Sequence, residues 1–591
     1  MKRRLTSPDE GRRRPENLAG KGRDELWSPA GPRPPPIPSP PVLGEPGPHE
    51  SRPRMPTRRR RRKSGTGARP NPWHGITRPG MKFTTDRRRA RTFMCTRHVG
   101  AFLDAMGDGW NGPLNKVDAF RYEIPRSYKP AMRTNGLVFI DESMVPQLRQ
   151  DQAPEQVANV ATMPGILGAA MAMPDIHWGY GFPIGGVAAF DYDDGVISPG
   201  GIGYDINCGV RLIRTNLLAA DVRSNLRALT DACFENVPSG VGEGGITKVS
   251  RQDLAKLATE GVGWSVEKGY AWSDDPDHIE ARGRLEDADF SKVGERAIAR
   301  GKDQVGSLGA GNHFVEIQKV DRVDDERAAK ALGIGEPGQV CVMVHTGSRG
   351  FGHQIATDYI EVCERVVKRE KIDLPDLQLA CAPIGSKEGL DYWRAMCCGA
   401  NFAWNNRQVI TYGVRNAFSK VLGQSPEALG MDIVYDVCHN IGKVEQHVIE
   451  GARHKVVVHR KGATRAFPAG HPETPAEYKA VGQPVLIPGD MGTCSFVLVG
   501  LPTAMEQSFG SSCHGAGRQM SRKAATRKYD ANEVVKSLDR RGIYLRAASR
   551  AGIVEEAPGA YKNVEDVVRV AEGAGLTKIV ARLVPLGVVK G

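Results

Sequence analysis

From about residue 112 to its end, the chain alternates between apolar runs and amphipathic stretches. Runs rich in β-branched residues predict buried strands at 340–345, 432–438, 454–459, 483–487 and 494–500. Apolar residues at helical spacing predict helices over 353–370, 391–422 and 564–572. The mixture predicts an α+β (mixed α/β) fold, and the irregular order of the elements argues against a barrel or a simple doubly wound sheet.

The first 80 residues have a different composition. They hold 17 prolines, and 19 Lys and Arg against 7 Asp and Glu, in a chain whose formal net charge is +13. Most of the excess positive charge therefore lies here, and it says little about the rest of the chain. We predict a disordered basic tail over 1–80, a poorly defined lead-in over 81–111 and one large domain over 112–591. Alternatively, translation starts at Met81, Met94 or Met106.

No apolar segment typical of a secretory signal follows Met1, and no apolar stretch reaches 18 residues. The eleven cysteines form no CxxC pair and have no regular spacing. Such spacing favours free thiols in a reducing compartment over a disulfide framework. We therefore predict a cytoplasmic protein without a membrane partner.

The glycine-rich run 200–209 contains the first candidate site residues. Its glycines permit a tight turn that would aim the Asp205 carboxylate and the Cys208 thiolate at one point. Together these side chains suggest a pair of metal ligands. The alternative is a structural turn with a buried free thiol, because free cysteine is among the most buried residue types.

Four histidines share one sequence context. Each comes at the end of an apolar or small-residue run, and a polar or glycine residue follows within three positions: His313, His345, His439 and His514. A single histidine of this kind is more often a core residue, but four of them with an Asp-x-x-Cys favour a site. Imidazole, thiolate and carboxylate suit zinc, cobalt or manganese better than magnesium or calcium. Five candidate ligands are enough for two ions bridged by a thiolate: Asp205, Cys208, His313, His345 and His439.

Several long motifs resemble the RtcB family of GTP-dependent RNA ligases. They are Met-Pro-Asp-Ile-His-Trp-Gly-Tyr-Gly (173–181), Gly-Gly-Ile-Gly-Tyr-Asp-Ile-Asn-Cys-Gly (200–209), Gly-Ala-Gly-Asn-His-Phe-Val-Glu (309–316), His-Thr-Gly-Ser-Arg-Gly (345–350), His-Arg-Lys-Gly-Ala-Thr-Arg (459–465) and Cys-His-Gly-Ala-Gly-Arg (513–518). The resemblance covers roughly 112–591 in collinear order and leaves the first 111 residues outside.

The resemblance implies an RNA ligase that joins a 2′,3′-cyclic phosphate or 3′-phosphate end to a 5′-hydroxyl end. GTP would supply the energy, two Mn²⁺ ions would be bound, and a histidine would become guanylylated. The Lys-x-Asp-Gly tetrad of lysine-dependent ligases is absent from this sequence. His514 is then the candidate nucleophile, because its glycine-rich loop lets a phosphate approach the backbone.

The resemblance also implies a role for each matching position. The five metal ligands proposed above match the family's manganese ligands, with Cys208 bridging, and Asp175 lies where the family has an acid near the reacting ends. The implied guanosine nucleotide contacts are Asn312, His313, Phe314, Val315, Glu316, His439, Asn440, Pro488, Gly489, Asp490, Met491, Ser495, His514, Gly515, Ala516, Gly517, Tyr561 and Lys590. Glu316 would accept hydrogen bonds from the guanine edge, whereas an acid at Asp490 would repel a triphosphate unless it binds metal or points away. Arg349 and Arg522 would hold RNA phosphates.

Two other functions use the same residues. A dinuclear metallohydrolase would activate a metal-bound water, but it has no need of a purine pocket. A non-catalytic RNA-binding protein with a structural metal would be expected to carry ligands at short spacings, unlike the distant segments here. We expect RNA with broken or spliced tRNA-like ends as the partner, an archease-type activator as a possible second partner, and a monomer.

Overall fold

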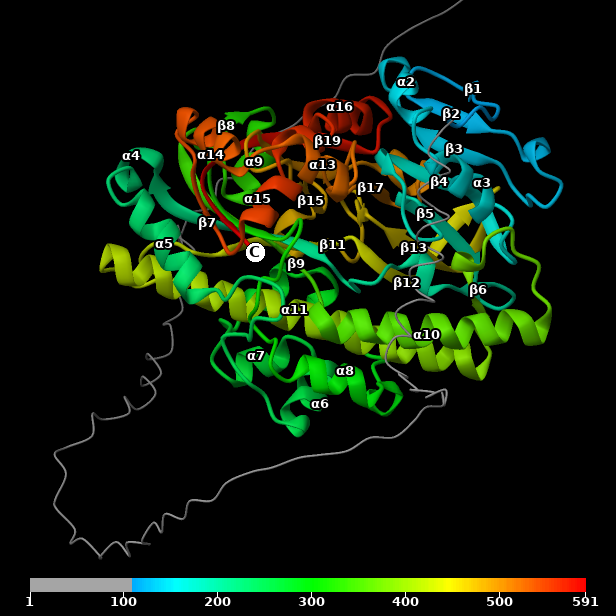
Figure 1. Ribbon diagram of the computed structural model, residues 1–591, viewed down its shortest axis with the longest axis horizontal. Helices are drawn as coiled ribbons and strands as arrows, with labels where there is room; N and C mark the ends of the chain where they lie inside the picture. The colour runs from blue at the N-terminus through cyan, green and yellow to red at the C-terminus, as the bar shows by residue number, and fades with distance from the viewer. Residues whose placement is uncertain (1–108) are drawn as a thin grey trace, which may run out of the picture. The chain divides into compact units, whose positions relative to one another are not determined.

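The computed structural model describes residues 109–591, so the tail predicted over 1–80 and all but the last three residues of the lead-in over 81–111 lie outside the described part. The chain divides into Met1–Asp86 and Arg87–Gly591, and all described residues belong to the second unit. This part is a mixed α/β structure built on two large sheets, as the sequence predicts (Figure 1).

The first sheet has seven strands in the order β1-β2-β3-β4-β5-β13-β12. Its neighbours are antiparallel except for the parallel pair β3 and β4. The strands are β1 (Asn115–Lys116), β2 (Arg121–Ile124), β3 (Gly136–Phe139), β4 (Ile166–His177), β5 (Ile184–Asp191), β12 (Asn440–Ile449) and β13 (Ala452–Lys461).

The second sheet follows the order β11-β7-β9-β8-β19-β16-β15, and β18 pairs with β19 in parallel. All its other pairs are antiparallel. The strands are β7 (Gly209–Leu218), β8 (Phe314–Val323), β9 (Gln339–Thr346), β11 (Ile433–Cys438), β15 (Pro484–Ile487), β16 (Ser495–Gly500), β18 (Tyr544–Ala547) and β19 (Thr577–Lys590). Two small sheets pair β6 (Val196–Ile197) with β10 (Ala382–Pro383) and β14 (Ala463–Arg465) with β17 (Ser511–Cys513).

The helices flank these sheets. They are α2 (Val145–Leu148), α3 (Ala153–Val160), α4 (Ala219–Val222), α5 (Leu226–Asn236), α6 (Arg251–Glu260), α7 (Gly263–Glu267), α8 (Glu295–Gly301), α9 (Glu326–Leu332), α10 (Arg349–Glu370), α11 (Lys387–Leu422), α12 (Pro502–Gln507), α13 (Arg522–Lys528), α14 (Ala531–Arg540), α15 (Arg550–Glu555) and α16 (Val564–Gly573). The five strands and three helices expected from periodicity are confirmed, with ends that differ by a few residues.

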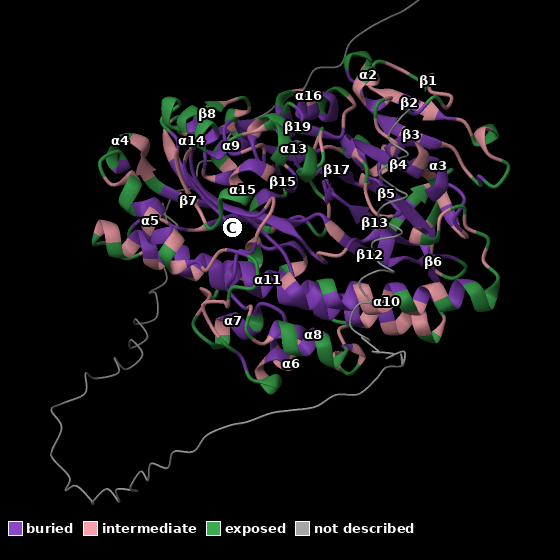
Figure 2. Cartoon of the chain, in the orientation of Figure 1, coloured by how far each residue is buried: buried purple, intermediate pink, exposed green. Residues whose placement is uncertain are grey.

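The 36-residue helix α11 packs beside α10 and under the eight-stranded sheet (Figure 1). Ser386 caps its first turn by accepting a hydrogen bond from the Gly389 N–H, and Gly423 ends it in the left-handed conformation. Much of the helix is buried (Figure 2). No helix in the described part combines the length and the apolar character needed to cross a membrane.

A buried ion cluster joins α11 to the sheet. The Asp436 carboxylate on β11 accepts hydrogen bonds from Arg407 Nε on α11 and Arg211 Nε on β7, each at 2.8 Å. All three side chains are fully buried. Arg407 also donates to the backbone carbonyls of Asn207 and Thr346, each at 2.8 Å. The cluster therefore fixes the backbone just before β7 and at the end of β9.

We predict that Asp436→Asn destabilises the fold by about 3–5 kcal/mol, because two buried guanidinium groups lose the carboxylate between them. Chemical denaturation measures the change. Glu295→Gln is the control, since Glu295 pairs with Arg251 on the surface and its loss should leave stability essentially unchanged. Equal stability of the two variants would contradict this role for the cluster.

Candidate metal and nucleotide site

Strand register brings four candidate ligands to one edge of the eight-stranded sheet. Cys208 and His313 directly precede β7 and β8, whereas His345 and His439 lie at the ends of β9 and β11. Because these neighbours are antiparallel, the end of one strand lies beside the start of the next. His345, for example, pairs with Val210 on one side and Phe314 on the other. The site therefore combines residues from the amino ends of β7 and β8 with residues from the carboxyl ends of β9 and β11. A parallel sheet would bring carboxyl ends alone to one edge.

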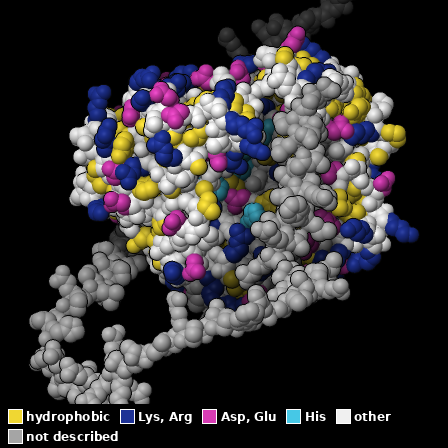
Figure 3. Space-filling model, viewed as in Figure 1, with side chains coloured by type: hydrophobic (Ala, Val, Ile, Leu, Met, Phe, Trp, Pro, Cys, Tyr) yellow, Lys and Arg dark blue, Asp and Glu magenta, His cyan; other side chains and the backbone are white. Residues whose placement is uncertain are grey.

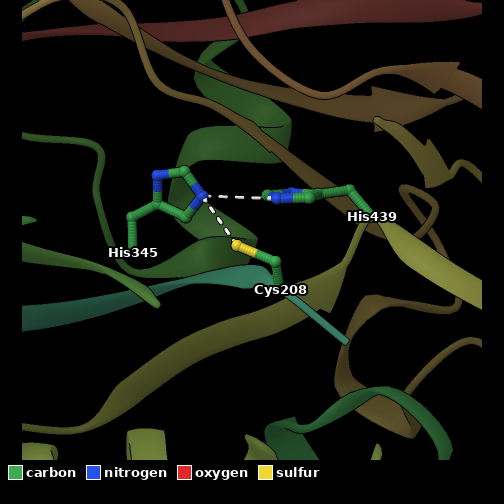
Figure 4. Close-up of side chains that lie close together, drawn as sticks. All are labelled: Cys208, His345 and His439. Carbon is green, nitrogen blue, oxygen red and sulfur yellow. Dashed lines mark hydrogen bonds between the residues drawn. The ribbon is translucent and has the colours of Figure 1, made fainter. Parts of the chain in front are cut away.

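The candidate ligands form two groups that share Cys208. One contains Cys208, His345 and His439, the other Asp205, Cys208 and His313, and in each the ligand atoms lie within 4.8 Å of one another. Cys208 Sγ is 3.3 Å from His345 Nε2, which is 3.3 Å from His439 Nε2 (Figure 4). Cys208 Sγ also lies 3.4 Å from His313 Nε2. The thiol is therefore placed between two potential ion positions.

Hydrogen bonds to neighbouring groups orient these ligands. The His313 Nδ1 lies 3.0 Å from the Leu308 carbonyl, so an Nδ1–H donated there leaves the Nε2 lone pair for a metal. Asp205 Oδ1 accepts a hydrogen bond from Ser348 Oγ at 3.2 Å. Between Asp205 and Cys208, Asn207 adopts a φ of 51° and donates its backbone N–H to the Asn440 carbonyl at 2.7 Å. The turn is thus held from several sides.

Burial controls the charge of the ligands. It lowers the pKa values of His345 and His439 well below the ordinary value, which leaves neutral imidazoles with free lone pairs. It also raises the pKa of the Cys208 thiol, and the Asp205 charge adds to that rise. A divalent cation would displace the thiol proton and stabilise the thiolate. The mixed sulfur, nitrogen and oxygen donor set fits a divalent transition metal.

His514 follows β17 and contacts Asp175 on β4. Its Nδ1 lies 2.5 Å from Asp175 Oδ2, and the backbone N–H groups of His514 and Gly515 donate to the same oxygen at 2.9 and 3.3 Å. Burial raises the pKa of Asp175, but the charge and hydrogen bonds of His514 outweigh this and hold it below the ordinary value. Gly517 has a φ of 72°, and a Cβ there would lie 2.3 Å from the Asp175 carbonyl oxygen, so a side chain does not fit.

His514 also meets the metal groups. Its ring centroid lies 4.8 Å from that of His439, and both rings line one cavity of about 380 Å³. Figure 3 shows histidine side chains inside a hollow on this face. The predicted site residues that line the cavity are Asp205, Cys208, Asn312, His313, Phe314, Glu316, His345, His439, Asn440, Pro488, Gly489, Asp490, Met491, His514, Gly515, Ala516, Gly517, Arg522, Tyr561 and Lys590.

Four predicted residues do not line the cavity. Asp175 lies behind His514, and Val315 packs into the core on the other face of the sheet. Ser495 is buried and accepts the Gly489 N–H at 3.3 Å. Arg349 is held by a hydrogen bond from its Nε to Ser307 Oγ at 3.3 Å. Asp175 and Ser495 thus support residues that line the cavity, whereas Arg349 lies outside its lining.

Two carboxyl groups, Glu316 and Asp490, determine the electrostatics at one end of the cavity. Burial raises the pKa of Glu316 to about 7, although Lys590 and a 2.8 Å hydrogen bond from Gln318 lower it. The Asp490 carboxylate is turned onto its own loop and accepts from Gly492 N at 2.8 Å and Thr493 Oγ1 at 2.9 Å. These bonds reduce the repulsion that the sequence suggested between this acid and a phosphate.

Several residues that line the cavity have no role predicted from the sequence. Lys461 lies in the motif 459–465, but nothing in the sequence assigned it a role; its Nζ donates to the Tyr180 and Phe182 carbonyls, and burial lowers its pKa to about 7. Glu556 lies in no motif, yet its buried carboxylate accepts from Arg518 at 3.1 Å and Arg522 at 3.0 Å. A motif could have pointed to Lys461, whereas no sequence signal marks Glu556.

Two overlapping groups of thiol, imidazole and carboxylate ligands beside a cavity are typical of a metal-dependent enzyme. A family model described as tRNA-splicing ligase RtcB matches residues 156–591. Proteins named tRNA-splicing ligase RtcB are similar over 81% of this chain and 99% of their own length. Those from Thermococcus kodakarensis, Archaeoglobus fulgidus and Methanococcus maripaludis are 53%, 55% and 52% identical. The chain therefore belongs to the RtcB family of tRNA-splicing ligases.

We predict that Cys208→Ala loses metal from both positions, because this thiol belongs to both ligand groups. His345→Ala should keep one ion, since His345 belongs to one group alone. Metal analysis of the purified variants after equilibration with Mn²⁺ gives the stoichiometry. Full occupancy in the Cys208 variant would remove this residue from the site.

Proposed function

We propose that the protein is a GTP-dependent RNA ligase. It joins RNA ends with a 2′,3′-cyclic phosphate or 3′-phosphate to 5′-hydroxyl ends, in tRNA splicing or RNA repair. The proposal rests on family membership and on one observation above all. His514, with its Nδ1 occupied by Asp175, lies in the same cavity as the metal groups and the Glu316 end.

The contact with Asp175 defines the chemistry of His514. Because Nδ1–H donates to the carboxylate, the lone pair is on Nε2, the nitrogen that would attack the α-phosphorus of GTP. The new phosphorus–nitrogen bond replaces the bond to the β-phosphate, and pyrophosphate leaves. Asp175 stabilises the positive charge that develops on the ring. Water first opens a 2′,3′-cyclic phosphate end to a 3′-phosphate. An oxygen of the 3′-phosphate then attacks the guanylyl phosphorus, and the phosphorus–nitrogen bond to His514 breaks. The 5′-hydroxyl finally attacks the phosphorus of the activated RNA 3′-phosphate, loses its proton and releases GMP.

Two Mn²⁺ ions would be held by Asp205, Cys208, His313, His345 and His439. When bound, they would neutralise phosphate charge and lower the proton affinity of nearby groups. Nucleotide binding would involve the cavity-lining contacts predicted above, together with Val315 and Ser495. Of the proposed RNA contacts, Arg522 reaches the cavity, and Arg349 would bind phosphate outside its lining.

The remaining assignments concern the substrate, the partners, the location and the domains. We propose RNA with tRNA-like ends as the substrate, an archease-type activator, a monomeric state and a cytoplasmic location. Residues 112–591 would form the ligase domain.

We predict a GMP–protein adduct that requires manganese, survives alkali and is lost in acid, as expected for phosphorus bound to imidazole nitrogen. The adduct should be absent from His514→Ala, which should keep its metal because His514 is not among the five ligands. GTP labelled at the α-phosphate detects it.

The same variant should still join RNA ends that are supplied with a guanylyl cap on the 3′-phosphate. A dinuclear hydrolase would give no adduct at all. An adduct that persists in His514→Ala, or that maps to Lys461, would overturn the proposed nucleophile while leaving the metal site intact.

We further predict that the KM for GTP rises as the pH falls through about 7. The raised pKa means that Glu316 is already protonated below this pH and then offers one acceptor fewer to the guanine edge. Below the pKa, the KM should rise by up to about tenfold for each pH unit until it reaches the value of a protein with a neutral side chain at this position. Glu316→Gln should bind GTP weakly at every pH without this dependence, and should retain manganese. A wild-type profile identical to that of the variant would argue against this role.

A further inference from the structure

Gln318 lies one position deeper than Glu316 on the same face of β8. Side chains alternate along a strand, so Phe314, Glu316 and Gln318 share one face while Val315 and Ile317 pack into the core behind it. Gln318 is fully buried and Glu316 is 3% exposed. The amide of Gln318 therefore lies beneath the carboxylate that borders the cavity.

The amide uses both of its N–H groups. Its Nε2 donates to Glu316 Oε2 at 2.8 Å and to Ser495 Oγ at 3.1 Å. Rotating the amide by 180° would set its carbonyl oxygen against the ionised Glu316 carboxylate, which is repulsive, so the ionised form of Glu316 selects this orientation. Its Oε1 is buried and has no hydrogen-bond partner among the described residues. A buried acceptor without a partner is unusual in a folded protein, and it marks this amide.

Ser495 extends the contact to the nucleotide loop. It begins β16, two strands away from β8, and its Oγ accepts the Gly489 N–H at 3.3 Å. One buried amide thus links the Glu316 carboxylate to the 488–491 segment. Both groups belong to the proposed guanosine site.

We propose that Gln318 is a positioning residue that sets the specificity for guanine by fixing the Glu316 carboxylate. This inference rests on the proposed function, in which Glu316 reads the base. Guanine presents N1–H and an exocyclic amine, hypoxanthine presents N1–H alone, and adenine presents an acceptor at N1. With Oε2 held by Gln318, the carboxylate has one orientation from which to accept both guanine donors. Without Gln318 the Glu316 carboxylate can rotate, and the hydrogen bond from the guanine amine then contributes less to binding.

The experiment compares GTP with ITP in the formation of the nucleotide–protein adduct by the full chain with Mn²⁺. In Gln318→Leu, the KM for GTP should rise about tenfold with little change in kcat, and the preference for GTP over ITP should fall by a similar factor. Gln318→Met fills the same volume with a flexible chain, and it serves as a second test if the leucine variant does not fold.

Gln339→Leu is the matched control. Gln339 also donates through its Nε2 to two acceptors, the Thr215 and Gly333 carbonyls, but at the opposite end of β9 from His345. Its loss should leave the GTP-to-ITP preference unchanged. Manganese content and thermal unfolding of all variants separate a local effect from a general one.

A double-mutant cycle tests whether Gln318 acts through Glu316. In a Glu316→Gln background, Gln318→Leu should cause no further loss of preference. An unchanged preference in both Gln318 variants, or additive losses in the cycle, would overturn the inference while the GTP-dependent adduct stands. Absence of any adduct from the wild-type protein would instead refute the proposed function, and the inference with it.

Discussion

The buried cluster of Arg211, Arg407 and Asp436 is the constraint on which the site depends. Arg211 is three residues after Cys208, and Asp436 is three residues before His439. Arg407 comes from the long helix, and its guanidinium donates to the carbonyls of Asn207 and Thr346, neighbours of Cys208 and His345. One carboxylate and two guanidinium groups thus tie three ligand-bearing segments to the core.

The cluster holds the metal ligands in a fixed geometry before a cation binds. Arginine stays protonated, so each guanidinium needs its buried partner, and the geometry is fixed by several charge-assisted bonds. The antiparallel register then sets the spacing, since strand neighbours lie about 5 Å apart. A site on flexible loops would lose more conformational entropy on binding metal. Here the folded sheet has already ordered the ligands.

The parts that sequence predicted are those with a local signal. The strand at 340–345 and the helix at 391–422 follow from apolar periodicity, and the glycine-rich setting of Cys208 and His514 marked them as site residues. Glu556 and Gln318 carry no such signal, because the hydrogen-bond partners Arg522 and Ser495 lie 34 and 177 residues away in the chain. Strand order and register were equally inaccessible, since they depend on pairings across hundreds of residues. Register is nevertheless what brings His313, His345 and His439 together.

Three buried lysines around the cavity add a second electrostatic constraint. Burial lowers the pKa of Lys461 to about 7 and that of Lys562 to about 8, and it lowers the pKa of Lys590 as well. Lys562 donates to the carbonyls of Pro174 and Ile176, on either side of Asp175, and so supports the strand that orients His514. A bound polyphosphate would raise all three pKa values, whereas bound cations would lower them. Metal and nucleotide should therefore favour each other's binding, because each compensates the charge that the other brings among these buried side chains.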